Sequence, residues 1–186
     1  MELKKVNVTK STGITANGLG ITREQVIKLS EDKCNKIKKL YNYKLILRET
    51  RIRKQRNYHE TDESSWLYKL IDNFIKVNLG KYHSLLQRVT ILRYDKGDYF
   101  KKHTDGNYNQ STSENLPYHF YGGVELNEKD EFDGGEFFVS DENVDYKKGR
   151  LFTHGFEESH GVKEVTRGTR WSIHFLISDG KKTTLI

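Results

Sequence analysis

The sequence has 186 residues, of which 34% are hydrophobic and 31% are charged, and its formal net charge is +6. This length suits one compact domain and is too short for two ordinary ones, so we expect residues 1–186 to form a single domain. The composition excludes a helical membrane protein, because no stretch approaches the roughly 18 consecutive apolar residues that a membrane span needs.

The single cysteine, Cys34, excludes an internal disulfide framework and a zinc site built from several cysteines. Residues 1–20 contain no apolar segment of the kind that directs secretion. We therefore expect a soluble, cytoplasmic protein in which any metal is held by histidine and carboxylate side chains.

Two amphipathic helices are predicted within residues 1–84, which we expect to form a basic, helical support for the rest of the chain. The first spans 22–40, with Thr22 as its N-cap and apolar residues at Val26, Ile27, Ile37 and Leu40. The second begins after Thr61 or Asp62 and ends before Gly80. Its apolar residues follow i, i+3, i+4 spacing and are Trp66, Leu67, Leu70, Ile71, Phe74 and Ile75.

Positive charge is concentrated in the first part of the chain. Residues 1–102 carry 23 Lys/Arg and 11 Asp/Glu, whereas residues 103–186 carry 9 and 15. Five cations fall within nine residues, at Arg48, Arg51, Arg53, Lys54 and Arg56. We favour a solvated basic face for this cluster, and a surface that binds nucleic acid or an acidic partner is the alternative.

From Leu85 onward, the helical period gives way to short β-rich runs separated by Gly, Asn and Asp residues. The runs are 85–94, 118–126, 136–139, 150–153, 161–165 and 170–177, which together predict a β-sandwich or an open barrel. In the last run, Arg170, Ser172, His174 and Leu176 alternate with four larger apolar residues. The face that carries Arg170, Ser172 and His174 is polar enough to line a site.

The tripeptide His103-Thr104-Asp105 is the strongest chemical signal in the sequence. Residues two apart in an extended chain project to the same side, so this imidazole and this carboxylate can share a cation. His160 is the best candidate for a third ligand, and His154 is its rival. Two histidines and one carboxylate on one face of a metal are typical of non-haem Fe(II) oxygenases.

Arg170 follows His160 by ten residues. Its planar guanidinium is suited to binding a carboxylate through two hydrogen bonds. A structural arginine, paired with a carboxylate of the protein, is the alternative.

These motifs, in this order, resemble the 2-oxoglutarate and Fe(II)-dependent dioxygenases, most closely their prolyl 4-hydroxylase-like branch. Residues 94–105 resemble that branch's Y-x-x-G-x-x-F-x-x-H-x-D segment, and residues 132–138 resemble its F-x-G-G-E-x-x-F strand. Residues 148–152 resemble the strand before the distal histidine. The ending H-x-V-x-x-V-x-x-G-x-K/R is matched by His160, Val162, Val165, Gly168 and Arg170. The resemblance covers about residues 85–178.

The resemblance implies a mainly β fold with N-terminal helices, in which residues 85–178 form a double-stranded β-helix, or jelly roll, supported by helices. It also favours His160 over His154, so the implied Fe(II) ligands are His103, Asp105 and His160. Arg170 would bind the distal carboxylate of 2-oxoglutarate.

Tyr94 and Ser172 are further candidates to bind the cosubstrate, although Tyr94 is equally compatible with a packed aromatic residue. L-ascorbic acid is the reductant that the resemblance suggests. Gly134 and Gly135 would let the backbone bend tightly at the rim of the barrel.

Three functions compete at this point. The first is hydroxylation of a peptidyl residue, with proline favoured, in a protein or peptide substrate, together with conversion of 2-oxoglutarate to succinate. The second is oxidative demethylation of nucleic acid, which the basic residues motivate; those relatives carry a second arginine where this chain has Leu176. The third is an inactive binding module, against which the complete set of site residues argues.

The polar segment 106–116 would cover the substrate.

Overall fold

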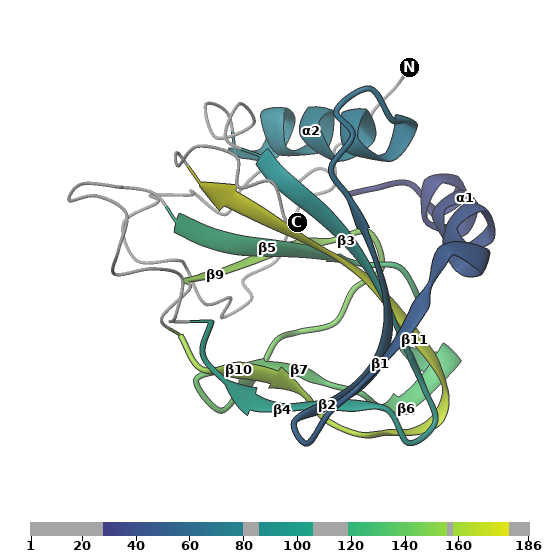
Figure 1. Cartoon of the computed structure of the whole chain (residues 1–186), viewed down its shortest axis with the longest axis vertical. Coiled ribbons are helices and arrows are strands. Elements are labelled where there is room, and N and C mark those ends of the chain that lie inside the picture. Colours follow the sequence, from purple (N-terminus) through teal and green to yellow (C-terminus); the bar gives the residue numbers. More distant parts are fainter. Residues whose placement is uncertain (1–27, 80–85, 106–118, 156–157, 179–186) are drawn as a thin grey trace.

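The computed structural model describes residues 28–79, 86–105, 119–155 and 158–178 (Figure 1). Two helices, α1 (Glu31–Tyr41) and α2 (Trp66–Leu79), flank a hairpin of β1 (Ile46–Glu49) and β2 (Arg53–Glu60). The remaining strands are β3 (Leu86–Asp95), β4 (Tyr99–His103), β5 (His119–Glu125), β6 (Phe132–Gly134), β7 (Phe137–Val139), β8 (Glu142–Asn143), β9 (Leu151–Gly155), β10 (His160–Val162) and β11 (Val165–Ser178).

The strands form a curled antiparallel sheet whose two ends face each other as layers (Figure 1). The hydrogen-bonded order is β8-β7-β10-β4-β2-β3-β11-β5-β9. Strand β2 pairs with both β3 and β4, and β11 pairs with β3, β5 and β6, so these two strands join the layers. The mainly β jelly roll with N-terminal helices is thereby confirmed.

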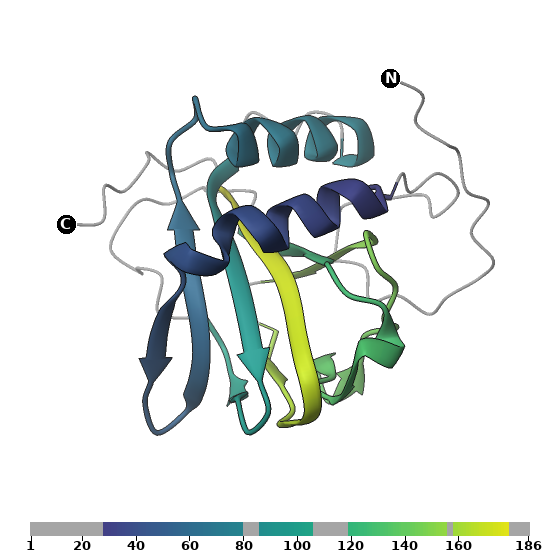
Figure 2. The same cartoon turned by 90° about the vertical axis from the view of Figure 1, so that its right-hand side faces the viewer.

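The helices lie side by side across the outer face of the layer that contains β3 and β11 (Figure 2). Their buried residues share one hydrophobic core with one face of β11. The core includes Ile37 of α1, Leu67, Ile71 and Ile75 of α2, and Trp171, Ile173, Phe175 and Ile177 of β11. The alternation predicted for the last run is therefore confirmed, and burial of each large side chain stabilises the fold by about 1.5–3 kcal/mol.

The first helix begins later than predicted. Residues 28–30 are not helical, Ser30 is the N-cap and the helix starts at Glu31, so Thr22 is not its cap. Tyr41 is buried in place of the predicted Leu40, which is 40% exposed. Residues 22–27 lie outside the described part of the chain.

Strands β1 and β2 are absent from the sequence prediction, which gave a helix on either side of this region and no element within it. The buried side chains of β2 are polar, namely Gln55, Asn57 and Glu60. Because no apolar alternation marks them, the usual signal of a half-buried strand is missing. The N-terminal support is therefore a helix, a hairpin and a second helix.

Most predicted β runs match strands to within a few residues, but the run 161–165 does not form one strand. It divides between β10 and the start of β11, and β11 consequently has 14 residues. The bend predicted at Gly134 and Gly135 is confirmed, since their φ angles are +69° and +64°. Among the described residues, neither helix is long and apolar enough to cross a membrane.

Candidate metal centre and pocket

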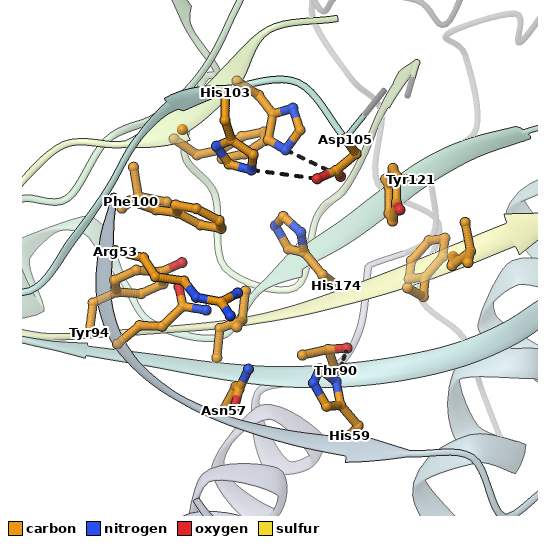
Figure 3. Close-up of a pocket in the computed structure, with 18 of the residues that line it drawn as sticks. Arg53, Asn57, His59, Thr90, Tyr94, Phe100, His103, Asp105, Tyr121 and His174 are labelled. Carbon is orange, nitrogen blue, oxygen red and sulfur yellow. Dashed lines mark hydrogen bonds and ion pairs between the residues drawn. The ribbon is translucent and has the colours of Figure 1, made fainter. Parts of the chain in front are cut away.

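Strand pairing brings together three side chains that could hold a metal. His103 ends β4, His160 begins β10, and the two residues lie opposite each other in this antiparallel pair. The Asp105 carboxylate faces both imidazoles (Figure 3). Its Oδ1 is 3.5 Å from His103 Nε2 and its Oδ2 is 3.5 Å from His160 Nε2. The candidate ligand atoms of the three residues all lie within 4.8 Å of one another.

The second nitrogen of each imidazole contacts a backbone carbonyl. His103 Nδ1 is 2.8 Å from the Lys101 oxygen, and His160 Nδ1 is 2.9 Å from the Glu158 oxygen. A carbonyl oxygen only accepts, so each Nδ1 carries the proton and donates it. Each Nε2 is then left with a lone pair on the side of Asp105, which is the form in which histidine binds metals.

The charges in this group also suit metal binding. Burial raises the pKa of Asp105, but the neighbouring His103 and His160 side chains outweigh burial and hold this pKa below its usual value. Burial lowers the pKa of His160. Near neutral pH the group therefore offers the carboxylate of Asp105 and the neutral imidazole of His160, donors of the kind that bind Fe(II).

His154, the rival third ligand, lies next to this group but not in it. Its ring centre is 4.3 Å from that of His160, and the side chain is fully buried. Nδ1 donates to the Gly155 carbonyl oxygen at 3.1 Å. Burial and the neighbouring His160 lower the pKa of His154 to about 3, so its ring is neutral. The position of His154 suits support of the His160 ring.

We expect the variant His154→Ala to bind one metal ion per chain, because the three candidate ligands remain. Its free energy of unfolding should fall by about 0.5–3 kcal/mol, since a buried ring is lost. Metal content after dialysis and a denaturant titration would measure the two quantities. Loss of the metal from His154→Ala, with retention in His160→Ala, would show that the distal ligand is His154.

Arg170, Tyr94 and Ser172 lie close together on paired strands. Arg170 is opposite Tyr94 in the β11–β3 pair, and its guanidinium carbon is 5.4 Å from the centre of the Tyr94 ring. All three side chains are buried, and Tyr94 lines the pocket beside the histidines. Among the described residues, the Tyr94 hydroxyl, the Ser172 hydroxyl and Arg170 Nε and Nη1 have no hydrogen-bond partner. These donors suit a ligand rich in acceptors, such as 2-oxoglutarate.

Arg170 is also part of a buried ion pair. Its Nη2 donates to Glu125 Oε1 at 2.5 Å, and Glu125 is itself 3% exposed. Part of the guanidinium is thus paired with Glu125, while Nε and Nη1 have no partner in the part of the chain that the structure describes. Arg170 can therefore pair with a carboxylate of the protein and still have nitrogens left to bind a ligand.

The pocket has a polar wall that the sequence prediction missed. Arg53, Gln55, Asn57 and His59 line it from β2, and Arg88 and Thr90 line it from β3. Figure 3 shows the Arg53 guanidinium directed into the pocket near Tyr94, below the His-Asp-His group. Within residues 53–59, polar side chains that line the pocket occur at every second position, and this spacing is the sequence signal that identifies the wall.

The basic cluster is therefore not one face. Arg53 faces the pocket, whereas Arg56 binds Asp95 and Asp98 at 2.6 Å and 3.0 Å. Arg48 and Arg51 are exposed near the β1–β2 turn. The segment 106–116, predicted to cover the substrate, lies outside the described residues and stays a prediction.

Comparison with known proteins agrees with this geometry. Residues 89–178 match the family described as the 2OG-Fe(II) oxygenase superfamily. The search of curated proteins finds no match.

Several solved structures share the fold. A Pseudomonas putida prolyl-4-hydroxylase superposes with a TM-score of 0.58 at 16% identity, over 82% of this chain and 89% of that chain. A prolyl hydroxylase from Trichoplax adhaerens, in complex with a peptide fragment of the hypoxia inducible factor oxygen degradation domain, gives a TM-score of 0.54 at 17% identity, over 78% and 76%. The carbocyclase SnoK from nogalamycin biosynthesis gives 0.63 at 11% identity, over 89% and 84%. At these identities the likeness concerns the fold, which hosts different reactions.

Proposed function

We propose, on the premise that residues 89–178 belong to the 2OG-Fe(II) oxygenase superfamily, that this protein hydroxylates a prolyl residue of a protein or peptide substrate. The observation that carries the proposal is the convergence of His103, Asp105 and His160 within 4.8 Å at the edge of a pocket. Fe(II) and 2-oxoglutarate would be its cofactor and cosubstrate, with ascorbate as reductant.

The residues of the chain would hold these groups in distinct ways. His103 and His160 would bind Fe(II) through Nε2, because backbone carbonyls fix Nδ1 as the protonated nitrogen. Asp105 would contribute one negative charge. When bound, Fe(II) and 2-oxoglutarate would supply an oxidation by dioxygen, in which one oxygen atom enters succinate as 2-oxoglutarate loses carbon dioxide and the other hydroxylates a C–H bond.

Arg170 would donate to the distal carboxylate of 2-oxoglutarate through Nη1 or Nε, which lie on opposite edges of the guanidinium and each lack a hydrogen-bond partner among the described residues. The hydroxyls of Tyr94 and Ser172 would donate to other oxygens of the same molecule. Phe100, whose ring stacks on His103 at 3.8 Å, shields one side of the site from water. These interactions position the ligand and exclude solvent, which is what the protein adds to the chemistry of the cofactor.

The prolyl substrate is supported by structural neighbours that are described as prolyl hydroxylases, one of them in complex with a peptide fragment. The motif at residues 132–138, which resembles the hydroxylase branch, points the same way. Asn57 and Thr90 line the pocket and offer hydrogen-bonding groups of the kind that can pair with an extended peptide.

We expect the full chain, supplied with Fe(II), 2-oxoglutarate and ascorbate, to form succinate faster when a proline-containing peptide is present. The peptide should gain the mass of one oxygen atom, and the same peptide with alanine in place of proline should not. Succinate release and peptide mass, measured across a peptide panel, test this. A failure of every proline peptide to be oxidised, while an alkylated oligonucleotide is demethylated, would contradict the proposal.

Nucleic-acid demethylation is the alternative that one observation favours, since Arg53 and Arg88 both line the pocket. Binding of a single strand to such residues would weaken with salt, with a log–log slope near −0.7 per neutralised phosphate. The oligonucleotide reaction would then be lost on neutralising these two arginines. An inactive binding module would oxidise neither substrate.

A further inference from the structure

Arg170 and Glu125 form a buried site with no net charge. They lie on the neighbouring strands β11 and β5, where Glu125 is opposite Ser172. Arg170 is fully buried, Glu125 is 3% exposed, and Arg170 Nη2 is 2.5 Å from Glu125 Oε1. The cation that would receive a carboxylate is therefore already neutralised by the protein.

The other titratable groups that face Glu125 do not alter this balance. Burial raises the pKa of Tyr94 and that of Tyr146 above their usual values, so both phenols are neutral. Lys129 acts on Glu125 only through its charge, because its ammonium contacts Glu136 Oε1 and the Gly134 oxygen at 3.4 Å each. With Glu125 ionised against Arg170 at 2.5 Å, the site consists of one cation, one anion and two neutral hydroxyls.

A second carboxylate bound to Arg170 would leave two anions against one cation in a buried site. An uncompensated buried charge is strongly unfavourable, and such a site responds by taking up or releasing a proton. Glu125 is the group that can respond, because burial holds its pKa above its usual value and the charge of Arg170 opposes this rise. When Arg170 shares its charge with a ligand, the effect of burial on this pKa prevails.

We propose that Glu125 takes up one proton from solvent when the distal carboxylate of 2-oxoglutarate binds Arg170. The proton adds to the Glu125 carboxylate, and the site returns to zero net charge. Glu125 then acts as a positioning residue, through Arg170, and couples cosubstrate affinity to pH. The inference rests on the proposed function, since it requires that Arg170 receive 2-oxoglutarate.

Titration calorimetry on the full chain loaded with Mn(II) tests the coupling directly. Binding of 2-oxoglutarate near neutral pH, measured in buffers of different ionisation enthalpy, should take up close to one proton per molecule bound. Its affinity should fall by up to about tenfold for each pH unit in the mildly alkaline range, because one proton is linked to binding. The matched ligand is 2-oxobutyrate, which has the same 2-oxo acid group without the distal carboxylate and should take up none.

The variant Glu125→Gln retains an acceptor for Arg170 and cannot take up the proton. Its affinity for 2-oxoglutarate should not depend on pH and should exceed that of the wild type in the mildly alkaline range. Binding by the wild type with no proton uptake, and with an affinity that is independent of pH, would overturn this inference alone. If 2-oxoglutarate did not bind at all, the proposed function would fail together with the inference.

Discussion

The variants His103→Ala and Asp105→Ala are each expected to lose bound metal and all measurable turnover. Removing a group that merely supports a metal ligand typically costs about 10–100-fold in metal affinity or activity, and removing one of only three ligands should cost more. In both variants the remaining two ligand atoms cannot enclose one face of the ion. Metal content after dialysis and succinate formation with a saturating peptide would measure the two losses.

His154→Ala is the matched control for these variants, because His154 lies against His160 and outside the three candidate ligands. It should retain bound metal and substantial turnover under conditions in which the ligand variants have neither. Circular dichroism should show that all of these variants are folded. Undiminished Fe(II)-dependent decarboxylation by folded His103→Ala would refute the proposed metal centre.

Removal of the Arg170 guanidinium is expected to weaken 2-oxoglutarate binding by about 30-fold or more. Truncating one member of a buried charge pair costs roughly 2–5 kcal/mol, which corresponds to this loss of affinity. The single variant Arg170→Ala also leaves Glu125 buried without its cation, so it should lose roughly 3–5 kcal/mol of folding stability.

The double variant Arg170→Met, Glu125→Gln separates these two effects. It removes both charges together, so its folding stability should recover most of the loss, whereas its affinity for 2-oxoglutarate should remain low. Calorimetry on the Mn(II)-loaded double variant, compared with Glu125→Gln alone, isolates the contribution of the guanidinium. An affinity equal to that of Glu125→Gln would mean that Arg170 serves the fold and not the cosubstrate.

The regions that the sequence predicts well are those in which apolar and polar residues recur at the regular spacing of a strand or a helix. Alternation along β11 identified both its core face and its polar face, and the helical spacing of α2 identified its buried stripe. The His103–Asp105 pair was predictable because two residues in extended backbone face the same way. The metal group thus follows from local geometry plus one distant histidine.

The features that the sequence does not predict depend on partners far along the chain. Glu125 and Arg170 are 45 residues apart, and no periodicity indicates that they form an ion pair. Strand β2 lacks an apolar alternation because its inward side chains are Arg53, Gln55 and Asn57, which line a polar pocket. A strand that forms a polar pocket wall thus lacks the apolar alternation by which a strand is usually identified.

The most direct test of the account is a reaction under labelled dioxygen with the proline peptide that stimulates succinate formation most. One labelled oxygen atom should appear in the peptide and the other in succinate, in equal amounts, and neither should appear with His103→Ala. Unlabelled hydroxylated peptide, or succinate formed without any oxidation of the peptide, would contradict the proposal that this protein is a 2-oxoglutarate-dependent prolyl hydroxylase.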